Sequence, residues 1–572
     1  MSTRTPMSIE GVVPWPDEYA SRYRSAGYWQ GKALGAYIFE KVDQHPDTEA
    51  LVDGSVRLTY RQLWDRAASC GQGLLDLGIR PGERIVLQLP NCWEFVALTL
   101  GCFRVGVIPV MALPAHRRHE LTHLSALSEA VAIVVADVDR DTDLRIVAQQ
   151  VAVEVPTVHS VMVHGELSVE QPDGGGVPEH SLAAVTDTQR HFVDDEYEPR
   201  GSDVACLLLS GGTTGLPKLI VRTHDDYAYN VIRCNAVSGI DSDTVYLGTL
   251  PSSHNFPLAC PGILGALFAG GRAVMLPSPA ADRALRTIED ESVTIAAVVP
   301  AVAQSWIEHQ REHHTLCGRS LRVLQVGGSR MPDELAARVE PVLGARLQQV
   351  FGMAEGLINM THLDDDLEVI TNTQGRPVSE ADEIMVVDDQ GAPVPDGVPG
   401  ALLTRGPYTP RGYFRAPEHN ARSFTPDGWY GSGDIVVQRP DGNMVVAGRD
   451  KDMINRGGEK ISAEEVENFA YQVEGVEMAA AVAMPDPKLG ERLCLYVSVA
   501  EDREVALVDV VNVMNAAGVA RFKIPERLVI VDRMPTTKVG KIDKKAIRED
   551  IRERLESAVT RSSSASVEED SQ

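Results

Sequence analysis

Short apolar runs alternate with helix-length segments through the first part of the chain, and this alternation restricts the possible folds more than any other feature. The runs lie at residues 84–89, 107–112, 131–136, 204–209, 273–276, 295–299 and 321–326. Runs of this length separated by helical segments are typical of βαβ units, whose parallel strands are covered by helices on both faces. The number of runs predicts more than one such sheet.

Two changes of pattern divide the chain further. Between residues 366 and 447, short β-like segments are broken by turns such as Pro-Asp-Gly, which predicts a small antiparallel β subdomain. Residues 451–555 form a domain-sized segment of mixed helix and strand pattern, and residues 556–572 are too polar to repay the entropy of ordering. We therefore predict an α/β fold: a large N-terminal domain of layered α/β subdomains at 1–450, a smaller α+β C-terminal domain, and a disordered tail.

Charge and cysteine content exclude several classes of function. The net charge of the 572-residue chain is −27, so phosphate backbones and anionic membranes should repel it, and we expect neither nucleic acid nor a membrane as a partner. The eight cysteines show no C-x-x-C spacing, which argues against a disulfide framework or a zinc ribbon. The start of the chain lacks the apolar core of a signal peptide, and we expect a cytoplasmic protein.

A loop rich in glycine and hydroxyl groups directly follows the run at 204–209. Glycines let the backbone approach an anion closely, and hydroxyls and a lysine can bind phosphate oxygens. The loop lacks the P-loop pattern G-x-x-x-x-G-K-[ST], because Lys218 lies between Pro217 and Leu219. The anion-binding residues that it predicts are Ser210, Gly211, Gly212, Thr213, Thr214, Gly215 and Lys218.

This loop resembles the phosphate loop of the adenylate-forming superfamily, which comprises acyl-CoA synthetases, luciferases and the adenylation domains of nonribosomal peptide synthesis. Four further motifs match the family, in the family's order, at residues 351–355, 430–434, 448–452 and 535–541, so that the resemblance covers nearly the whole chain. It implies that the protein activates a carboxylic acid with ATP and Mg²⁺ as cofactors.

The matching positions carry the family's roles over to this sequence. Glu355 is implied to hold the Mg²⁺, which prefers carboxylate oxygens. Asp434 is implied to accept hydrogen bonds from the ribose, with assistance from Arg449. Residues implied to line the nucleotide are Gly352, Met353 and Ala354. A lone carboxylate is usually a solvated surface group, and these assignments therefore depend on the motifs around them.

In the C-terminal domain the resemblance implies a catalytic lysine and a moving domain. Lys541 matches the lysine that bridges the acid's carboxylate and the α-phosphate, although on composition alone it belongs to a charged surface loop. Lys451 matches the hinge about which the domain swings between an adenylating and a thioester-forming pose. Gly457, Gly458 and Lys460 would then face the incoming thiol, unless the two glycines form only a turn.

The segment 254–260 resembles the start of the acid pocket in the aryl-acid ligases of siderophore pathways. Family members that activate amino acids place an Asp where this chain has Asn255, and a neutral amide cannot pair a buried ammonium. Cys260 stands where a cysteine goes with salicylate and a serine with 2,3-dihydroxybenzoate, because a thiol is a weak partner for the extra hydroxyl. Salicylate is therefore favoured, with 2,3-dihydroxybenzoate and 3-hydroxypicolinate left open; alternatively, Cys260 is only a buried structural cysteine.

The same resemblance assigns the rest of the pocket. His254 would gate the acid against ATP, the alternative being a hydrogen-bonded core histidine. Phe256 would stack beside the ring. The residues implied to wall the ring are Gly327, Ser329 and Ile358, together with Gly328 and Val350, which are assigned to the nucleotide site as well.

The sequence contains no carrier domain, and the predicted acceptor is a separate phosphopantetheinylated aryl carrier protein, with CoA as the alternative. Arg521, Lys523 and Arg527 could contact an acidic carrier helix, or could form a solvated basic face. A non-catalytic scaffold that only binds nucleotide or carrier is a further alternative, against which Lys218, Glu355 and Lys541 argue.

Overall fold

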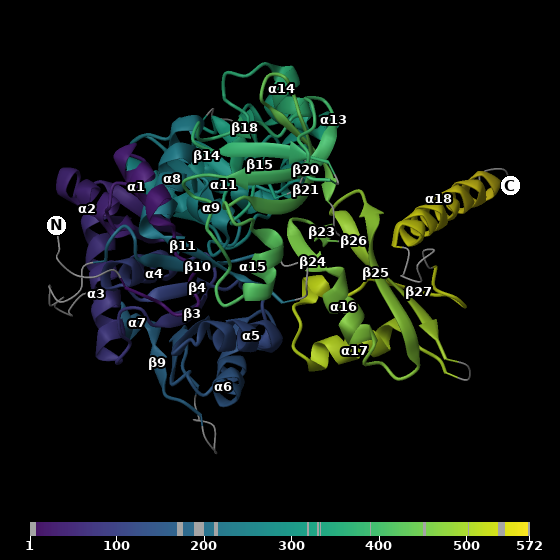
Figure 1. Ribbon diagram of the computed structural model, residues 1–572, viewed down its shortest axis with the longest axis horizontal. Coiled ribbons are helices and arrows are strands. Elements are labelled where there is room, and N and C mark those ends of the chain that lie inside the picture. Colours follow the sequence, from purple (N-terminus) through teal and green to yellow (C-terminus); the bar gives the residue numbers. More distant parts are fainter. Residues whose placement is uncertain are drawn as a thin grey trace. The chain divides into compact units, whose positions relative to one another are not determined.

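The computed structural model describes residues 7–168, 176–187, 199–210, 216–316, 320–328, 331, 333–388, 390–449, 453–500, 503–535 and 544–569. The chain separates into two compact units at residue 450. One holds residues 1–210 and 217–450, and the other holds residues 451–572. Each unit is described by itself below, with the element labels of Figure 1.

The larger unit contains two mainly parallel sheets, which confirms the predicted α/β class. In the first sheet the strands are parallel except for the hairpin of β10 and β11 and follow the order β11 (Leu219–Thr223), β10 (Val204–Leu209), β4 (Ile108–Met111), β3 (Arg84–Gln88), β5 (Ala132–Ala136), β8 (Ser160–His164) and β9 (Glu179–Ser181). A small β6–β7 hairpin (Val138–Asp139, Thr142–Asp143) lies apart from it.

In the second sheet the strands follow the order β18 (Arg376–Pro377), β17 (Ile358–Met360), β16 (Arg346–Gly352), β15 (Val323–Gly327), β14 (Ile295–Val298), β12 (Val245–Gly248), β13 (Arg272–Met275), β1 (Glu49–Asp53) and β2 (Val56–Thr59). Pairing is parallel from β16 to β1 and antiparallel at both edges. The topology fits the strand runs read from the sequence.

Helices cover both faces of the two sheets. They are α1 (Asp17–Ser25), α2 (Leu34–Gln44), α3 (Tyr60–Asp76), α4 (Trp93–Val105), α5 (Arg118–Ser128), α6 (Leu144–Glu154), α7 (Leu182–Val185), α8 (His224–Ser238), α9 (Asn255–Ala259), α10 (Gly262–Ala269), α11 (Ala281–Asp290), α12 (Pro300–His313), α13 (Asp333–Leu343), α14 (Leu367–Asn372) and α15 (Pro417–Ser423). Among the helices that the structure describes, none has the length and apolar content needed to cross a membrane.

Alternate residues of each buried strand enter different cores, as a pleated strand requires. In β3, Ile85 and Leu87 pack into a central core with α2, α3, α4, α8 and α10, whereas Val86 packs into a core with α5 and α6. In β12, Tyr246 joins the central core and Leu247 joins a third core with α11, α12 and α13. The central helices therefore lie between the two sheets.

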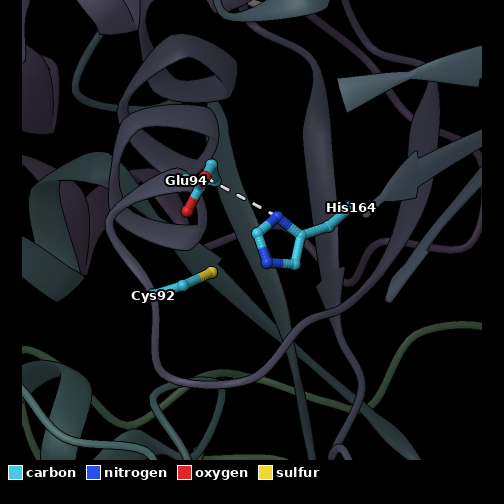
Figure 2. Close-up of side chains that lie close together, drawn as sticks. All are labelled: Cys92, Glu94 and His164. Carbon is cyan, nitrogen blue, oxygen red and sulfur yellow. Dashed lines mark ion pairs between the residues drawn. The ribbon is translucent and has the colours of Figure 1, made fainter. Parts of the chain in front are cut away.

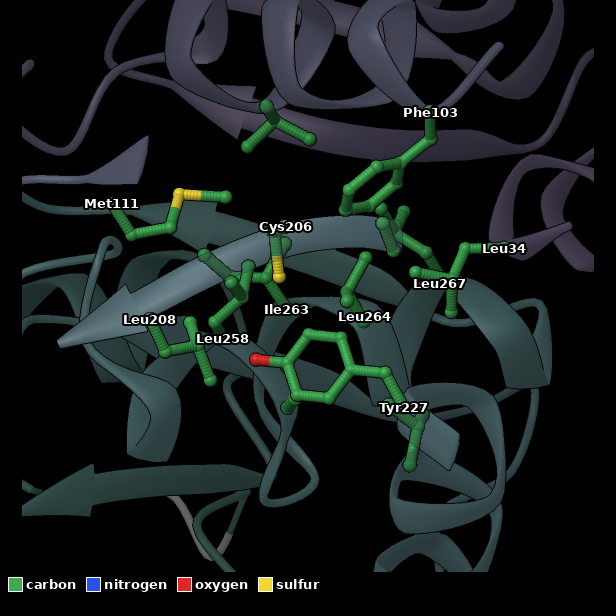
Figure 3. Close-up of a cluster of buried hydrophobic side chains, with 14 of the residues drawn as sticks. Leu34, Phe103, Met111, Cys206, Leu208, Tyr227, Leu258, Ile263, Leu264 and Leu267 are labelled. Carbon is green, nitrogen blue, oxygen red and sulfur yellow. The ribbon is translucent and has the colours of Figure 1, made fainter. Parts of the chain in front are cut away.

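Figure 3 shows part of this central layer, where the ring of Tyr227 lies among apolar side chains of several elements. Leu208 reaches the layer from β10, Leu258 from α9 and Ile263 from α10. All of these side chains are buried.

The antiparallel sheet of the larger unit follows the order β19 (Glu383–Val387), β20 (Pro399–Arg405), β21 (Tyr430–Gln438) and β22 (Met444–Arg449). It begins later than residue 366, where the sequence predicted it. Residues 367–377 form α14 and β18 instead, because β18 pairs with β17 at the edge of the second parallel sheet. Because α14 lies between β17 and β18, no short hairpin turn marks their pairing in the sequence.

The C-terminal unit is built on one sheet with the order β24 (Glu459–Ser462), β23 (Met453–Arg456), β26 (Gly490–Val499) and β25 (Val476–Asp486), with β27 (Arg527–Ile530) also pairing with β26. Ala479 and Ala481 pack with α16 (Ala463–Ala470) and α17 (Leu507–Ala516). Ala480 and Val482 point to the other face, where they meet Ile547 and Ile551 of α18 (Lys544–Glu569). Figure 1 shows α16 and α18 on opposite sides of β25.

The end of the chain differs from its predicted disorder, since α18 continues through residues 556–569. Composition alone predicted a free tail because it ignores what precedes the tail. The helix is nucleated by its first turns, where Ile547 and Ile551 are buried against the sheet, and extending a formed helix costs far less than starting one.

Replacing Ile551 with Ala should loosen α18 from the sheet of the C-terminal unit. Because Ile551 is fully buried, we expect a loss of about 2–5 kcal/mol in the unfolding free energy of that unit. Hydrogen exchange of the β25 and β26 amides against denaturant measures it. Val508→Ala, at a side chain 57% exposed in the same unit, should change the value by less than about 0.5 kcal/mol. Equal exchange in both variants would contradict the packing described.

Candidate functional site

The loop that leads into α9 is held by a buried asparagine. Asn91 donates from Nδ2 to the carbonyl oxygens of Gly248 (3.1 Å) and Leu250 (2.9 Å), and its Oδ1 accepts the Ser252 amide (2.8 Å). Its side chain thereby ties the end of β3 in the first sheet to the end of β12 in the second. The residues predicted to form the acid pocket follow directly.

His254 caps the N-terminus of α9 through Nδ1, which accepts the Phe256 amide at 3.2 Å. Its side chain is exposed, so the sequence alternative of a core histidine does not apply. A histidine at this helix end combines a local structural role with an imidazole that water can reach.

Asn255 lies at the centre of a buried hydrogen-bonded group. Its Oδ1 accepts the hydroxyl of Tyr227 at 2.9 Å, and its Nδ2 donates to Cys260 Sγ at 3.3 Å. Burial raises the pKa of Tyr227 well above its usual value, which keeps the phenol protonated and able to donate. An amide nitrogen carries two protons, so Nδ2 can serve one more acceptor besides the thiol. The Asn255 amide carries no charge, as the sequence predicted, and the Tyr227 phenol beside it is protonated.

The predicted ring wall is assembled at the ends of three adjacent strands. Gly327 of β15 pairs with Val350 of β16, and Ile358 of β17 pairs with Gly352 at the end of β16. The ring of Phe256 lies so close to Gly327 that a Cβ there would stand 3.0 Å from Cε1. A side chain at 327 would therefore displace the aromatic ring. Gly328 has φ +85°, which favours glycine, and Ser329 lies outside the described residues.

The two described ends of the phosphate loop lie beside a tyrosine and the predicted metal ligand. The Ser210 amide donates to the Lys218 carbonyl oxygen at 2.9 Å, and Lys218 Nζ lies 5.0 Å from the ring centroid of Tyr413. The Tyr413 hydroxyl donates to Glu355 Oε1 at 3.0 Å and lies 3.1 Å from the hydroxyl of Tyr430. Residues 211–215, the middle of the loop, lie outside the described residues.

Burial raises the pKa of Tyr413, so its hydroxyl stays protonated and orients the Glu355 carboxylate. One carboxylate oxygen is thus engaged by a phenol, and a carboxylate offers about four acceptor positions in all. A buried carboxylate near the end of a phosphate loop suits a hard divalent cation, which Glu355 would hold. These residues therefore fit the Mg²⁺ implied by the sequence.

A tight turn between β16 and β17 carries the motif that precedes Glu355. The Met353 amide donates to the Leu357 carbonyl oxygen, and the Gly356 amide to that of Met353, both at 3.1 Å. At Gly352 a Cβ would lie 2.6 Å from Cδ1 of Ile358, so glycine is needed for the close approach. Gly352, Met353, Ala354 and Glu355 are thus held as one rigid segment.

The two residues predicted for the ribose lie on neighbouring strands. Asp434 of β21 is directly opposite Arg449 of β22 in the antiparallel register. Asp434 is buried, and its amide donates to the Ser432 hydroxyl at 3.1 Å. Sequence reasoning placed both residues in one role without showing that their strands pair.

A buried arginine that sequence reasoning missed connects the nucleotide segment with the acid pocket. Arg222 of β11 donates from Nε to Asp226 Oδ1 at 2.6 Å and from Nη1 to the Ala354 carbonyl oxygen at 3.1 Å. Its guanidinium lies 4.6 Å from the ring centroid of Tyr227, which donates to Asn255. Neither side chain of the Arg222–Asp226 pair is exposed. The sequence carries one local signal for this ion pair: Arg222 interrupts an apolar strand, and an arginine inside a buried strand must pair with a buried partner.

In the C-terminal unit, Gly457 and Gly458 form the turn of the β23–β24 hairpin with φ +60° and +95°. Two successive left-handed residues are typical of a type I′ turn and favour glycine. This agrees with the simpler of the two sequence alternatives and leaves the thiol-facing role untested. Lys451 and Lys541 lie outside the described residues, as does the side chain of Lys460.

Lys523 does not belong to a basic surface. Its Nζ lies 3.0 Å from Glu465 Oε2, and both side chains are at most 5% exposed. The expectation of a carrier-binding or solvated lysine is therefore wrong, because Lys523 serves an internal ion pair between η1 (Arg521–Lys523) and α16. Arg521 remains exposed and Arg527 half-buried.

The sequence model of the AMP-binding enzyme family matches residues 38–414, and that of the AMP-binding enzyme C-terminal domain matches residues 465–541. The chain is 54% identical to the salicylyl-CoA synthase / salicylate adenylyltransferase of a Streptomyces species, over 96% of this chain and 99% of that protein.

It is also 44% identical to the salicyl-AMP ligase / salicyl-S-ArCP synthetase of Mycobacterium tuberculosis, over 94% of each chain. Among solved structures, the apo structure of Mycobacterium smegmatis MbtA matches with a TM-score of 0.73 and 44% identity, covering 94% of this chain and 98% of that one. The chain is therefore similar to these two relatives in sequence, and to the solved structure in both sequence and fold, over nearly its full length.

Breaking the Arg222–Asp226 pair should destabilise the protein strongly. Arg222→Met leaves a buried carboxylate without its partner and should cost about 3–5 kcal/mol of unfolding free energy, as should Asp226→Leu. The double variant Arg222→Met/Asp226→Leu should lose less than the sum of the two, because no lone charge remains buried. Urea unfolding of all four proteins measures this coupling. Strictly additive losses would show that the pair is not a unit.

Proposed function

The chain belongs to the AMP-binding enzyme family, and we propose that it activates an aryl acid, salicylate first, with ATP to form aryl-AMP and pyrophosphate. We propose further that the aryl group is then transferred to the phosphopantetheine thiol of a separate aryl carrier protein. The observation that carries the choice of acid is the buried neutral group of Tyr227, Asn255 and Cys260.

This group favours an acid without a positive charge. A substrate ammonium would lose its water and gain no carboxylate from the three side chains, which is costly in a buried site. A planar acid with an ortho hydroxyl can instead accept from the remaining Nδ2 proton of Asn255. The ring of Phe256, which packs directly against Gly327, offers an aromatic surface beside which a flat ring can stack. The two relatives described above, both named for salicylate, support the same acid.

Cys260 supports salicylate over 2,3-dihydroxybenzoate. Its sulfur is 1% exposed and already accepts from Asn255, and a thiol is a poor partner for another hydroxyl. A 3-hydroxyl group near this thiol would lose its hydrogen bonds to water and gain only a weak one in return. Salicylate has a ring hydrogen at that position, which makes no hydrogen bond in water or in the site.

Adenylation brings a carboxylate to the α-phosphorus of ATP, so two anions must approach each other. The phosphate loop and Lys218 are suited to bind the phosphates, and Asp434 and Arg449 to bind the ribose. Glu355, oriented by Tyr413, would hold the Mg²⁺, which when bound neutralises phosphate charge. Arg222 keeps the Ala354 backbone and the Tyr227 ring in fixed relation, so that acid and nucleotide are presented together.

For the acceptor we propose the carrier thiol, and the printed name of the Mycobacterium tuberculosis relative includes synthesis of a salicyl carrier-protein thioester. CoA is a second candidate, because the name of the Streptomyces relative includes salicylyl-CoA synthase. Both acceptors end in the same phosphopantetheine thiol. Comparing thioester formation on free CoA with that on the loaded carrier protein distinguishes them.

We assign the remaining positive charge of the adenylation step to Lys541, with Lys451 as the hinge that brings it to the site. Gly457, Gly458 and Lys460 would face the thiol after the swing. His254, exposed at the start of α9, would close the acid site toward the nucleotide. These assignments rest on the family motifs and on the separation of the chain into units at residue 450.

Lys541→Ala should slow adenylation about 10²- to 10³-fold, since a preorganised charge at the reacting oxygens is removed. Salicylate-dependent exchange of labelled pyrophosphate into ATP measures this step. Transfer of the aryl group from supplied salicyl-AMP to the carrier should remain near normal. Lys488→Ala, at an exposed lysine of the same unit, is the matched control. Normal exchange in Lys541→Ala would overturn the assignment.

Cys260→Ser should shift the acid preference toward 2,3-dihydroxybenzoate, because a hydroxyl can donate to and accept from the 3-hydroxyl group. We expect the ratio of kcat/KM values for 2,3-dihydroxybenzoate over salicylate to rise about tenfold, the effect of one good hydrogen bond. Cys102→Ser, at a buried cysteine of α4, controls for the loss of a thiol. An unchanged ratio in Cys260→Ser would remove this residue from substrate choice.

A further inference from the structure

Three side chains that take no part in the networks described above converge at the carboxyl ends of the strands of the first sheet. Cys92 and Glu94 lie at the start of α4, and His164 lies at the end of β8. Figure 2 shows the three side chains pointing toward one another. One ligand atom from each lies within 4.8 Å of the other two, and His164 Nδ1 is 3.6 Å from Glu94 Oε1.

The topology of the sheet explains why residues so far apart in sequence meet. β3 leads to Cys92, and β8 carries His164. Both strands pair in parallel with β5, so their carboxyl ends lie on the same side of the sheet. Asp53, at the end of β1, accepts the Trp93 amide at 3.0 Å and interacts electrostatically with Cys92 and His164. A second carboxylate thus stands next to the three converging groups.

We propose that Cys92, Glu94 and His164 bind a zinc ion, with water or Asp53 as the fourth ligand. A thiolate, an imidazole and a carboxylate are the ligand types that zinc takes, at about 2.0–2.3 Å from the metal. Ligands around such an ion stand about 3.5 Å apart. The Glu94–His164 separation already meets this spacing, and Cys92 Sγ lies within 4.8 Å of both ligand atoms.

The surroundings of the three side chains would let a metal ion enter and would supply negative charge to balance it. The side chain of His164 is 32% exposed and that of Glu94 is 14% exposed, so a hydrated ion can reach the group, whereas Cys92 is buried behind them. The thiol loses its proton to water on binding, and Glu94 and Asp53 add negative charge. The bound ion would join the start of α4 to the end of β8, next to Asn91, which holds the acid-pocket loop.

The test uses the full chain, freed of metal with a chelator and titrated with zinc against a chromogenic competitor. We expect one zinc ion per chain. Cys92→Ser and His164→Ala should each weaken binding at least about tenfold, because even the loss of an outer-shell partner commonly does so. His159→Ala, at an exposed histidine just before β8, and Cys494→Ala, at a buried cysteine of the other unit, should bind as the parent does.

Cobalt in place of zinc gives a second measurement that does not depend on how stable the variants are. The parent protein with one equivalent of cobalt should show the near-ultraviolet absorption of a thiolate–cobalt bond, and Cys92→Ser should lack it. Zinc affinity that is the same in the parent, Cys92→Ser and His164→Ala, or a parent cobalt spectrum without the thiolate band, would overturn the proposal.

Discussion

A guanidinium buried away from water must keep every partner it has, and this constraint fixes the distance between the two parallel sheets where the site forms. Arg222 extends from β11 of the first sheet, pairs with Asp226 at the start of α8, and donates to Ala354 beyond β16 of the second sheet. The partners cannot separate without leaving a charge unpaired in a low-dielectric interior. Strand β11, the nucleotide segment and Tyr227 are therefore linked to one another through a single side chain.

The proposed acid pocket is built around an amide and a phenol, whereas the proposed nucleotide site is built around ionisable side chains. Tyr227, Asn255 and Cys260 satisfy one another inside the central layer, and a ligand must match the one donor that they leave available. On the nucleotide side, Lys218, Glu355 and Asp434 concentrate ionisable groups near Tyr413 and β21. In the proposed assignment the first half binds the acid and the second half the nucleotide, which matches the amide and phenol of the first and the ionisable groups of the second.

Much of the fold could be predicted from the sequence, because strands buried on both faces must be apolar throughout and therefore stand out, as at 131–136 and 204–209. The phosphate loop and the motifs around Glu355 and Asp434 are local, so their residues could be named in advance. Tyr413 and Arg222 could not, since each acts through contacts with segments over 50 residues away. Lys523 was misjudged for a related reason, since its partner Glu465 is 58 residues away. β18 was missed because α14 lies between it and its partner β17, so that no hairpin turn marks the pair. The motif-based assignments of Lys541, Lys451 and Ser329 remain predictions.

The central sheet of the C-terminal unit carries helices on both faces, with alanines at most of the facing positions of β25. Ala479, Ala480 and Ala481 let the backbone of β25 approach its neighbours closely, and each face is closed by residues of the unit itself. Such a module contains its own apolar interior, built from residues of this unit alone. Substitutions in these two cores should therefore change the stability of the C-terminal unit and leave the cores of the larger unit as they are.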